Sequence, residues 1–407
     1  MRVATAHAYD TTIAQLNKRQ AELATQQERI SSGKRVMRAS DDPVAAALSE
    51  SVQTRLSRVQ TDQRALDSSR TSIQQAESAL GEAGDLVQKV RDLIIAGGNG
   101  GYGPTERAAL AKDIEGLRDQ LFAAANRKDS AGHGLFGGLG GSATPFVQEF
   151  GSGSNEVRFD GQRGQQAAGD NQLPNAMDGE AILMRIPAGN GTFSIDLPAG
   201  NTGSLRADTG QVTNLSALTG HDYRIDFSGT AGAMQYSVTD VTTGTPVAGQ
   251  TGVAYSAGSQ IEFDGMSFRP SGEPRAGDQM DITPSAAPTD MFKVMQDAID
   301  ALSLDTGSSG DAAVRTHDLG RALAELDAGH ERVLLARAQA GEWLNRADSI
   351  DSLLADREVD HTTEQSQLVD IDLVKAYSQY KTMEIGMQAA LQSYASVQKL
   401  SLFQYLS

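Results

Sequence analysis

Apolar residues recur at every seventh position between Asp42 and Ile95, and this repeat strongly constrains how the chain folds. An uninterrupted seven-residue repeat places an apolar line along one side of a helix, and a second helix has to cover that line. A helix over this range would be about 80 Å long at 1.5 Å per residue. We therefore predict a helical rod whose core residues are Val52, Val59, Leu66, Ile73, Leu80, Val87 and Ile94.

The composition agrees with a rod and excludes several kinds of partner. Only 39% of the 407 residues are hydrophobic and 5% are aromatic, which is too few to fill a large compact core. The net charge of −17 argues against nucleic acid and against an anionic membrane surface as partners. No run of apolar residues is long enough for a transmembrane helix, so we expect no membrane insertion.

Further helices are predicted on both sides of the chain's middle. The first covers residues 9–30 and ends before Gly33, while Asp42 and Pro43 start the long helix. A third runs from about residue 105 to 128. On the carboxyl-terminal side, helix is expected from residue 289, again over 311–356, and in a last segment after the polar stretch REVDHTTEQSQ, which breaks the apolar pattern.

The first and last helices carry weaker apolar repeats than the rod. Their flanks are Ala, Thr and Gln, so each buries little surface by itself. Because the two weak repeats match, we expect the terminal helices to lie side by side and to form the surface used in assembly. The expected interface residues are Ile13, Leu16, Leu23, Ile30, Leu373, Tyr380, Met383, Met387, Tyr394 and Val397.

The middle of the chain alternates apolar and polar residues over short runs such as VRFDG, DYRIDF and QYSVTDV, which is typical of strands. The predicted fold is therefore multi-domain and mainly α. A long antiparallel, coiled-coil-like rod is built from both chain ends, with an inserted β-rich domain. The expected domains are terminal helices at 1–36 and 367–407, a helical rod at 37–145 and 289–366, and a β-rich outer domain at 146–288.

Patterns that would carry catalysis are largely missing. Two GxGxxG strings begin at Gly98 and Gly132, but neither follows a strand and opens a helix, so inter-helix turns are the better interpretation. The six histidines are scattered and the chain has no cysteine. We expect no enzyme activity, no metal site and no cofactor.

One long segment resembles a known family. The stretch LNKRQAELATQQERISSGKRVMRASDDPVAAALSE, with Ser32–Val36 and Ser40–Pro43 inside it, is similar to the amino-terminal signature of the bacterial flagellin superfamily. GEWLNRADSIDSLLADRE and the last helix extend the likeness to the carboxyl-terminal side. The ending QKLSLFQYLS resembles the hook-associated members of the superfamily more than flagellin itself.

The resemblance implies a structural adaptor that joins the flagellar hook, through the first hook-associated protein, to the flagellin filament. It also implies copies of the same chain and an export chaperone as partners. The protein would be extracellular in the flagellum, exported through a type III apparatus without a cleaved signal peptide. Two alternatives stay open: a flagellin that forms the filament itself, or a secreted coiled-coil protein of another type III apparatus.

Overall fold

The computed structural model describes the backbone of residues 2–148, 156–166, 173–285, 287–304 and 307–406. Side chains are described from Asp10 to Ser396 within these ranges. The chain forms two compact units. One comprises Met1–Ala65 with Ile350–Ser407, and the other comprises Leu66–Ser349. Two long helices contribute residues to both units.

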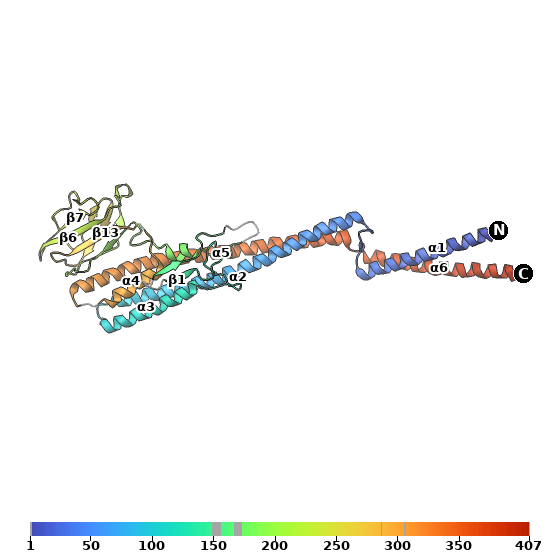
Figure 1. The fold of residues 1–407 in the computed structure, drawn as a ribbon, viewed down its shortest axis with the longest axis horizontal. Helices are drawn as coiled ribbons and strands as arrows, with labels where there is room; N and C mark the ends of the chain where they lie inside the picture. Colours follow the sequence, from blue (N-terminus) through green and yellow to red (C-terminus); the bar gives the residue numbers. More distant parts are fainter. Residues whose placement is uncertain (1, 149–155, 167–172, 286, 305–306, 407) are drawn as a thin grey trace. The chain divides into compact units, whose positions relative to one another are not determined.

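Helices make up most of both units. Their bounds are α1 Arg2–Ser32, α2 Pro43–Gly97, α3 Pro104–Ala125, α4 Met291–Ser303, α5 Ser309–Val369 and α6 Leu373–Leu406. In the first unit, α1 and α6 lie side by side (Figure 1). In the second unit, α3 packs against α4.

Local chemistry explains where the long helix α2 begins. Asp42 accepts a hydrogen bond from the amide nitrogen of Ala45 at 3.0 Å, which satisfies one of the free N–H groups of the first turn. Pro43 at the first helical position loses nothing, because its missing N–H has no partner there. Along α2, every seventh residue from Val52 to Ile94 is buried, with at most 6% of its surface exposed.

Helix α5 is longer than the sequence pattern suggests. The polar stretch REVDHTTEQSQ does not interrupt it, and the helix continues to Val369. The stretch contains neither Gly nor Pro, and its Glu, Gln and Arg are good helix formers. Its polar side chains contact α2: Glu358 accepts from Gln63 at 3.1 Å, and Gln365 donates to Gln53 at 2.7 Å.

The first two strands of the middle region, β1 Phe146–Gln148 and β2 Val157–Phe159, pair with each other and lie against helices of the second unit. The ring of Phe146 packs on Phe292 of α4 with centroids 5.9 Å apart. Farther along, Ile186 forms an antiparallel bridge with Thr289. The chain therefore enters and leaves the outer β-rich part between these two residues.

The remaining strands form small antiparallel sheets. The largest has the order β3-β13-β6-β7-β8, with β9 also pairing with β7. Strands β10, β11 and β5 form a second sheet, and β12 and β4 a third. Their bounds are β3 Phe193–Asp196, β4 Arg206–Ala207, β5 Gln211–Val212, β6 Tyr223–Thr230, β7 Ala233–Asp240, β8 Thr245–Pro246, β9 Val253–Ala254, β10 Ile261–Phe263, β11 Met266–Phe268, β12 Pro270–Ser271 and β13 Gln279–Pro284.

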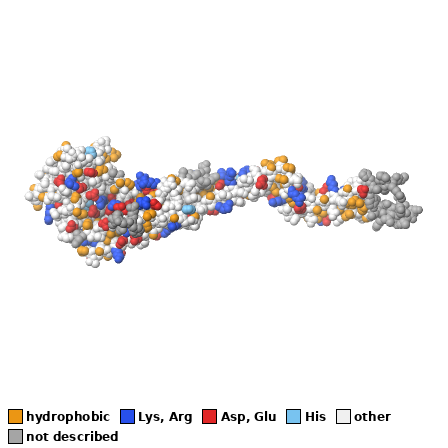
Figure 2. Space-filling view, in the orientation of Figure 1, with side chains coloured by type: hydrophobic (Ala, Val, Ile, Leu, Met, Phe, Trp, Pro, Cys, Tyr) orange, Lys and Arg blue, Asp and Glu red, His pale blue; other side chains and the backbone are white. Residues whose placement is uncertain are grey.

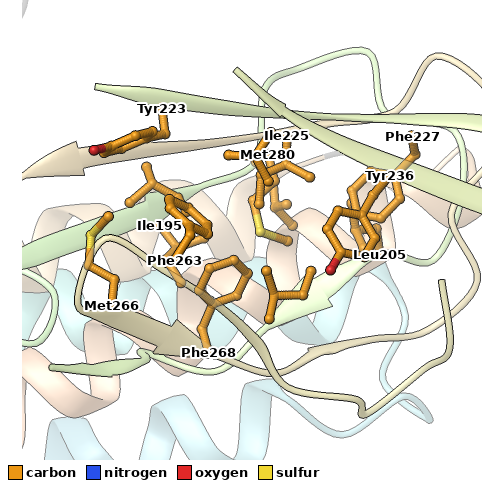
Figure 3. Packing of buried hydrophobic residues seen from close by; sticks show 14 of the residues in the cluster. Ile195, Leu205, Tyr223, Ile225, Phe227, Tyr236, Phe263, Met266, Phe268 and Met280 are labelled. Carbon is orange, nitrogen blue, oxygen red and sulfur yellow. The ribbon is translucent and has the colours of Figure 1, made fainter. Parts of the chain in front are cut away.

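The outer β-rich part has an apolar core of its own. Ile225 and Met280 are fully buried between paired strands, and Phe263 and Phe268 come from the neighbouring hairpin (Figure 3). The alternating strand pattern places these side chains on one face. Each deeply buried apolar side chain contributes about 1.5–3 kcal/mol, so this cluster is sufficient to hold the small sheets together.

Candidate assembly surface

The terminal helices α1 and α6 bury little of their surface against each other. Among their described side chains, only Gln26 at 7% and Ala376 at 2% are almost completely covered. Large apolar side chains remain exposed on α6, such as Val374 at 84% and Ile385 at 65%. Figure 2 shows hydrophobic side chains at the surface of this helix pair. Such a surface on a single chain marks an unfilled contact.

Polar groups set the register of the pair. The Gln26 side chain donates from Nε2 to the carbonyl oxygen of Ala376 at 3.1 Å. The Arg19 guanidinium donates to the carbonyl oxygen of Gly386 at 3.3 Å. Contacts of this kind fix which residues face each other without burying much apolar area.

A short backbone connection lies at the inner end of the pair, where α1 and α6 both begin or end. Lys34 and Asp370 form an antiparallel bridge, and the amide of Ile371 donates to the carbonyl of Gly33 at 3.0 Å. On the other side, the amide of Arg35 donates to the carbonyl of Val369 at 2.7 Å. We refer to residues 33–36 together with 369–372 as the elbow.

The side chain of Arg35 ties the elbow to the start of α2. It donates to the carbonyl of Leu368 at 2.7 Å and to the Asp42 carboxylate at 3.1 Å. The backbone hydrogen bond from Ala45, followed by that from Arg35, lowers the pKa of Asp42. Asp41 accepts from the amides of Met37 and Arg38, and these bonds lower its pKa. Both carboxylates therefore hold the SDDP turn in one shape.

The structure divides the predicted interface residues into two groups. Leu16, Leu23, Ile30, Tyr380, Met387 and Tyr394 are half-buried, whereas Ile13, Leu373 and Met383 are exposed. The side chain of Val397 lies outside the described residues. The heptad reading thus includes positions that face the partner helix and positions that do not.

Sequence reasoning missed a second apolar face on α6. Val374, Tyr377, Ile385 and Leu391 are exposed and fall between the heptad positions. A seam search selects a single line along a helix, whereas α6 is apolar on more than one side. Counting apolar residues around the whole helix would have revealed this face.

The elements that might suggest chemistry have structural explanations. The first glycine-rich string connects α2 to α3, where Gly103 is the N-cap, and the second follows α3 with Gly132 at a φ of 88°. No cluster of three or more His, Asp or Glu that could hold a metal ion occurs among the described residues. In the same part of the chain, no helix is long and apolar enough to cross a membrane.

Comparison with known proteins now becomes informative. Residues 3–140 match the family described as the bacterial flagellin N-terminal helical region. Flagellar hook-associated protein 3 of Escherichia coli K12 is 26% identical over 409 aligned residues, which cover 99% of each chain. The chain belongs to the bacterial flagellin superfamily. It is most like hook-associated protein 3, because flagellins align with far less of it: polar flagellin F of Vibrio parahaemolyticus is 32% identical over 29% of this chain.

Solved structures of such proteins share the fold. Flagellar hook-associated protein 3 from Legionella pneumophila is 26% identical with a TM-score of 0.70, covering 78% of this chain and 98% of its own. The junction protein FlgL of Xanthomonas campestris is 28% identical with a TM-score of 0.68, covering 78% and 99%. The expectation of a helical protein with a central β-rich region is confirmed. These flagellin-like, hook-associated proteins are structural components of the flagellum.

Proposed function

We propose that this chain is the structural adaptor between the flagellar hook and the flagellin filament. The observation that carries the proposal is the full-length similarity to hook-associated protein 3, a protein whose solved relative is described as a flagellar junction protein. Its neighbours in the assembly are copies of itself, the first hook-associated protein on the hook side and flagellin on the filament side.

The rod in this proposal is an antiparallel coiled coil of α2 and α5, with Val52 to Ile94 as its core. Side-chain pairs in each unit support it. In the second unit, Glu77 accepts from Arg337 and Asp327 accepts from Arg91, both at 2.8 Å. In the first unit, Glu364 accepts from Arg55 at 3.0 Å. The positions rise along α2 as they fall along α5, and the seam residues are buried.

Assembly takes place through α1 and α6, which are only weakly held in a single subunit. Their apolar side chains, including Leu16, Tyr380 and Met387, have too little partner surface within the chain. Packing against neighbouring subunits would bury the rest, at about 25 cal/mol for each Å² of apolar surface. Before assembly, an export chaperone would cover α6, and export would leave the amino terminus uncleaved.

The alternative is a flagellin that elongates the filament itself, and the match to the flagellin N-terminal helical region supports it. Adding purified chain to sheared filament seeds separates the two functions. The adaptor should bind the seed ends and stop, whereas continuous growth would establish the filament protein. A deletion strain should keep its hooks, lose its filaments and release flagellin into the medium.

A matched pair of variants connects the test to the proposed surface. Met387→Asp should bind neither hook nor seed, because it places a charge on the half-buried face of α6. Met387→Leu, which keeps the volume and the apolar character, should bind as the native chain does. Equal binding of both variants would remove α6 from the assembly surface.

A further inference from the structure

His317 of α5 lies where two sheets of the outer β-rich part end. Strand β3 is at the edge of the largest sheet, and β4 belongs to the separate pair with β12. The ring atom Nε2 of His317 is 2.8 Å from the carbonyl oxygen of Ile195 on β3. Its Nδ1 is 3.2 Å from the carbonyl oxygen of Ala207 on β4. One imidazole therefore connects both strands to the helix.

These distances make the contact depend on the number of protons on the ring. A carbonyl oxygen only accepts, so Nε2 has to carry a hydrogen to bind Ile195. Nδ1 can bind the carbonyl of Ala207 only if it is protonated as well. Without that proton it can accept instead from the amide nitrogen of Ala207, which is farther away at 3.4 Å.

The ring is 6% exposed, and a cavity of about 120 Å³ adjoins it. The charged groups around it come from every neighbouring element. They are Asp318, Arg321 and Glu325 on α5, Asp196 on β3, Asp208 after β4, Arg206 on β4, and Asp290, Lys293 and Asp297 at α4. Carboxylates outnumber the cations, which favours a positively charged ring.

We propose that His317 is a proton-dependent latch that holds the outer β-rich part on α5. With both ring nitrogens protonated, the latch donates to Ile195 and Ala207 and closes the gap between the two sheet edges. With one proton it keeps Ile195 and changes to the longer contact with the amide of Ala207. Histidine is the side chain that ordinarily changes charge between pH 5 and 8, so mild acidification tightens the docking.

The experiment is a pH titration of the full chain by nuclear magnetic resonance from pH 5.5 to 8.0. We expect the ring nitrogens of His317 to show the two-proton form at low pH. The amide shifts of Ala207 and Asp196 should move with the same midpoint. Exchange protection of these amides, corrected for the intrinsic pH effect, should be about tenfold higher at the acidic end.

Two variants assign the response. His317→Gln should remove the shift at Ala207 and make the protection independent of pH. Asp290→Asn should leave that shift in place, although it removes a nearby carboxyl that titrates near pH 6. If the native chain shows no movement at Ala207 while His317 titrates, the latch does not exist. Loss of the step in Asp290→Asn would assign it to the carboxyl and also overturn the proposal. Both decisions hold even if His317→Gln fails to fold, since the native chain and Asp290→Asn supply them.

Discussion

The side-chain amide of Gln26 on α1 donates to the backbone carbonyl of Ala376 on α6, across 3.1 Å and 350 positions of sequence. Both residues are almost fully covered, unlike the other described side chains of this helix pair. A buried amide with a partner fixes register more strongly than it adds stability. The polar pair is therefore the reference point of the weakly packed terminal helices.

Removing that amide should loosen the pair by a small amount. For Gln26→Ala we expect a loss of about 1 kcal/mol, which makes the amides of α6 near Ala376 exchange about fivefold faster in the soluble chain. The exposed neighbour gives a matched control, because Gln27→Ala removes the same group from a side chain that faces water. Equal rates in the two variants would mean that the hydrogen bond does not hold the register.

Aspartate at the rod seam should act very differently from aspartate on the terminal helices. Ile73 is 2% exposed, so Ile73→Asp buries a charge and should lower the free energy of unfolding by roughly 4 kcal/mol or more. Met387→Asp should leave the main thermal transition of the monomer nearly unchanged while abolishing assembly. Calorimetry of both variants checks this. A fall in Tm for Met387→Asp as large as that for Ile73→Asp would contradict the division between rod and tail.

The elbow offers a test of backbone conformation. Gly33 has a φ of 70°, a value that suits glycine, and a Cβ placed there would meet no atom within 4 Å. Gly33→Ala should therefore cost about 1 kcal/mol from the backbone alone. Gly33→Asn should cost less, because asparagine tolerates this conformation. Exchange of the Ile371 amide, which donates to Gly33, reports the change, and identical effects of Ala and Asn would exclude a conformational origin.

Asp290 predicts how stability changes with pH. Burial raises the pKa of its carboxyl to about 6, although the carboxylate caps α4 by accepting from the amide of Lys293. At pH 8 the group is ionised in the folded and the unfolded chain. As pH falls through 6 the folded chain binds the proton first, so its stability rises until the unfolded chain is also protonated near pH 4. We expect a gain of roughly 2 kcal/mol over that window.

The check is a series of thermal melts between pH 4.5 and 8. Asp290→Asn keeps an oxygen for the cap but cannot ionise, so it should melt higher at pH 8 and lose most of the dependence. Asp113→Asn, on the exposed side of α3, should leave the dependence intact. A dependence that survives in Asp290→Asn would have to come from other groups, such as Glu325, whose pKa is also raised by burial.

Much of the helical architecture could be predicted because its signals are local. The repeat from Val52 to Ile94, the cap at Asp42 and the glycine at position 33 each follow from spacing or backbone preference alone. The end of α5 could not, because the polar stretch after residue 356 lacks a seam and is instead matched to polar residues of α2. Helix length there depends on a partner far away in sequence.

The candidate surface was predictable only in part. The heptad rule found Leu16 and Met387 but also selected Leu373, which is 55% exposed, and it omitted Tyr377 and Ile385. Which side of α6 faces α1 is decided by the close approach at Ala376 and by the amide of Gln26. Neither residue stands out by hydrophobicity, so no apolar pattern could indicate them.

The sequence by itself determined that this chain makes long helices from both ends around a β-rich middle, since periodicity and turn residues act over a few positions. Tertiary structure alone decided which distant groups meet. Arg35 ties the carbonyl of Leu368 to Asp42, and His317 joins the edges of β3 and β4. The physical reason is that a polar side chain carries a capacity for hydrogen bonds but no address, and only the folded backbone brings its partner within 3 Å.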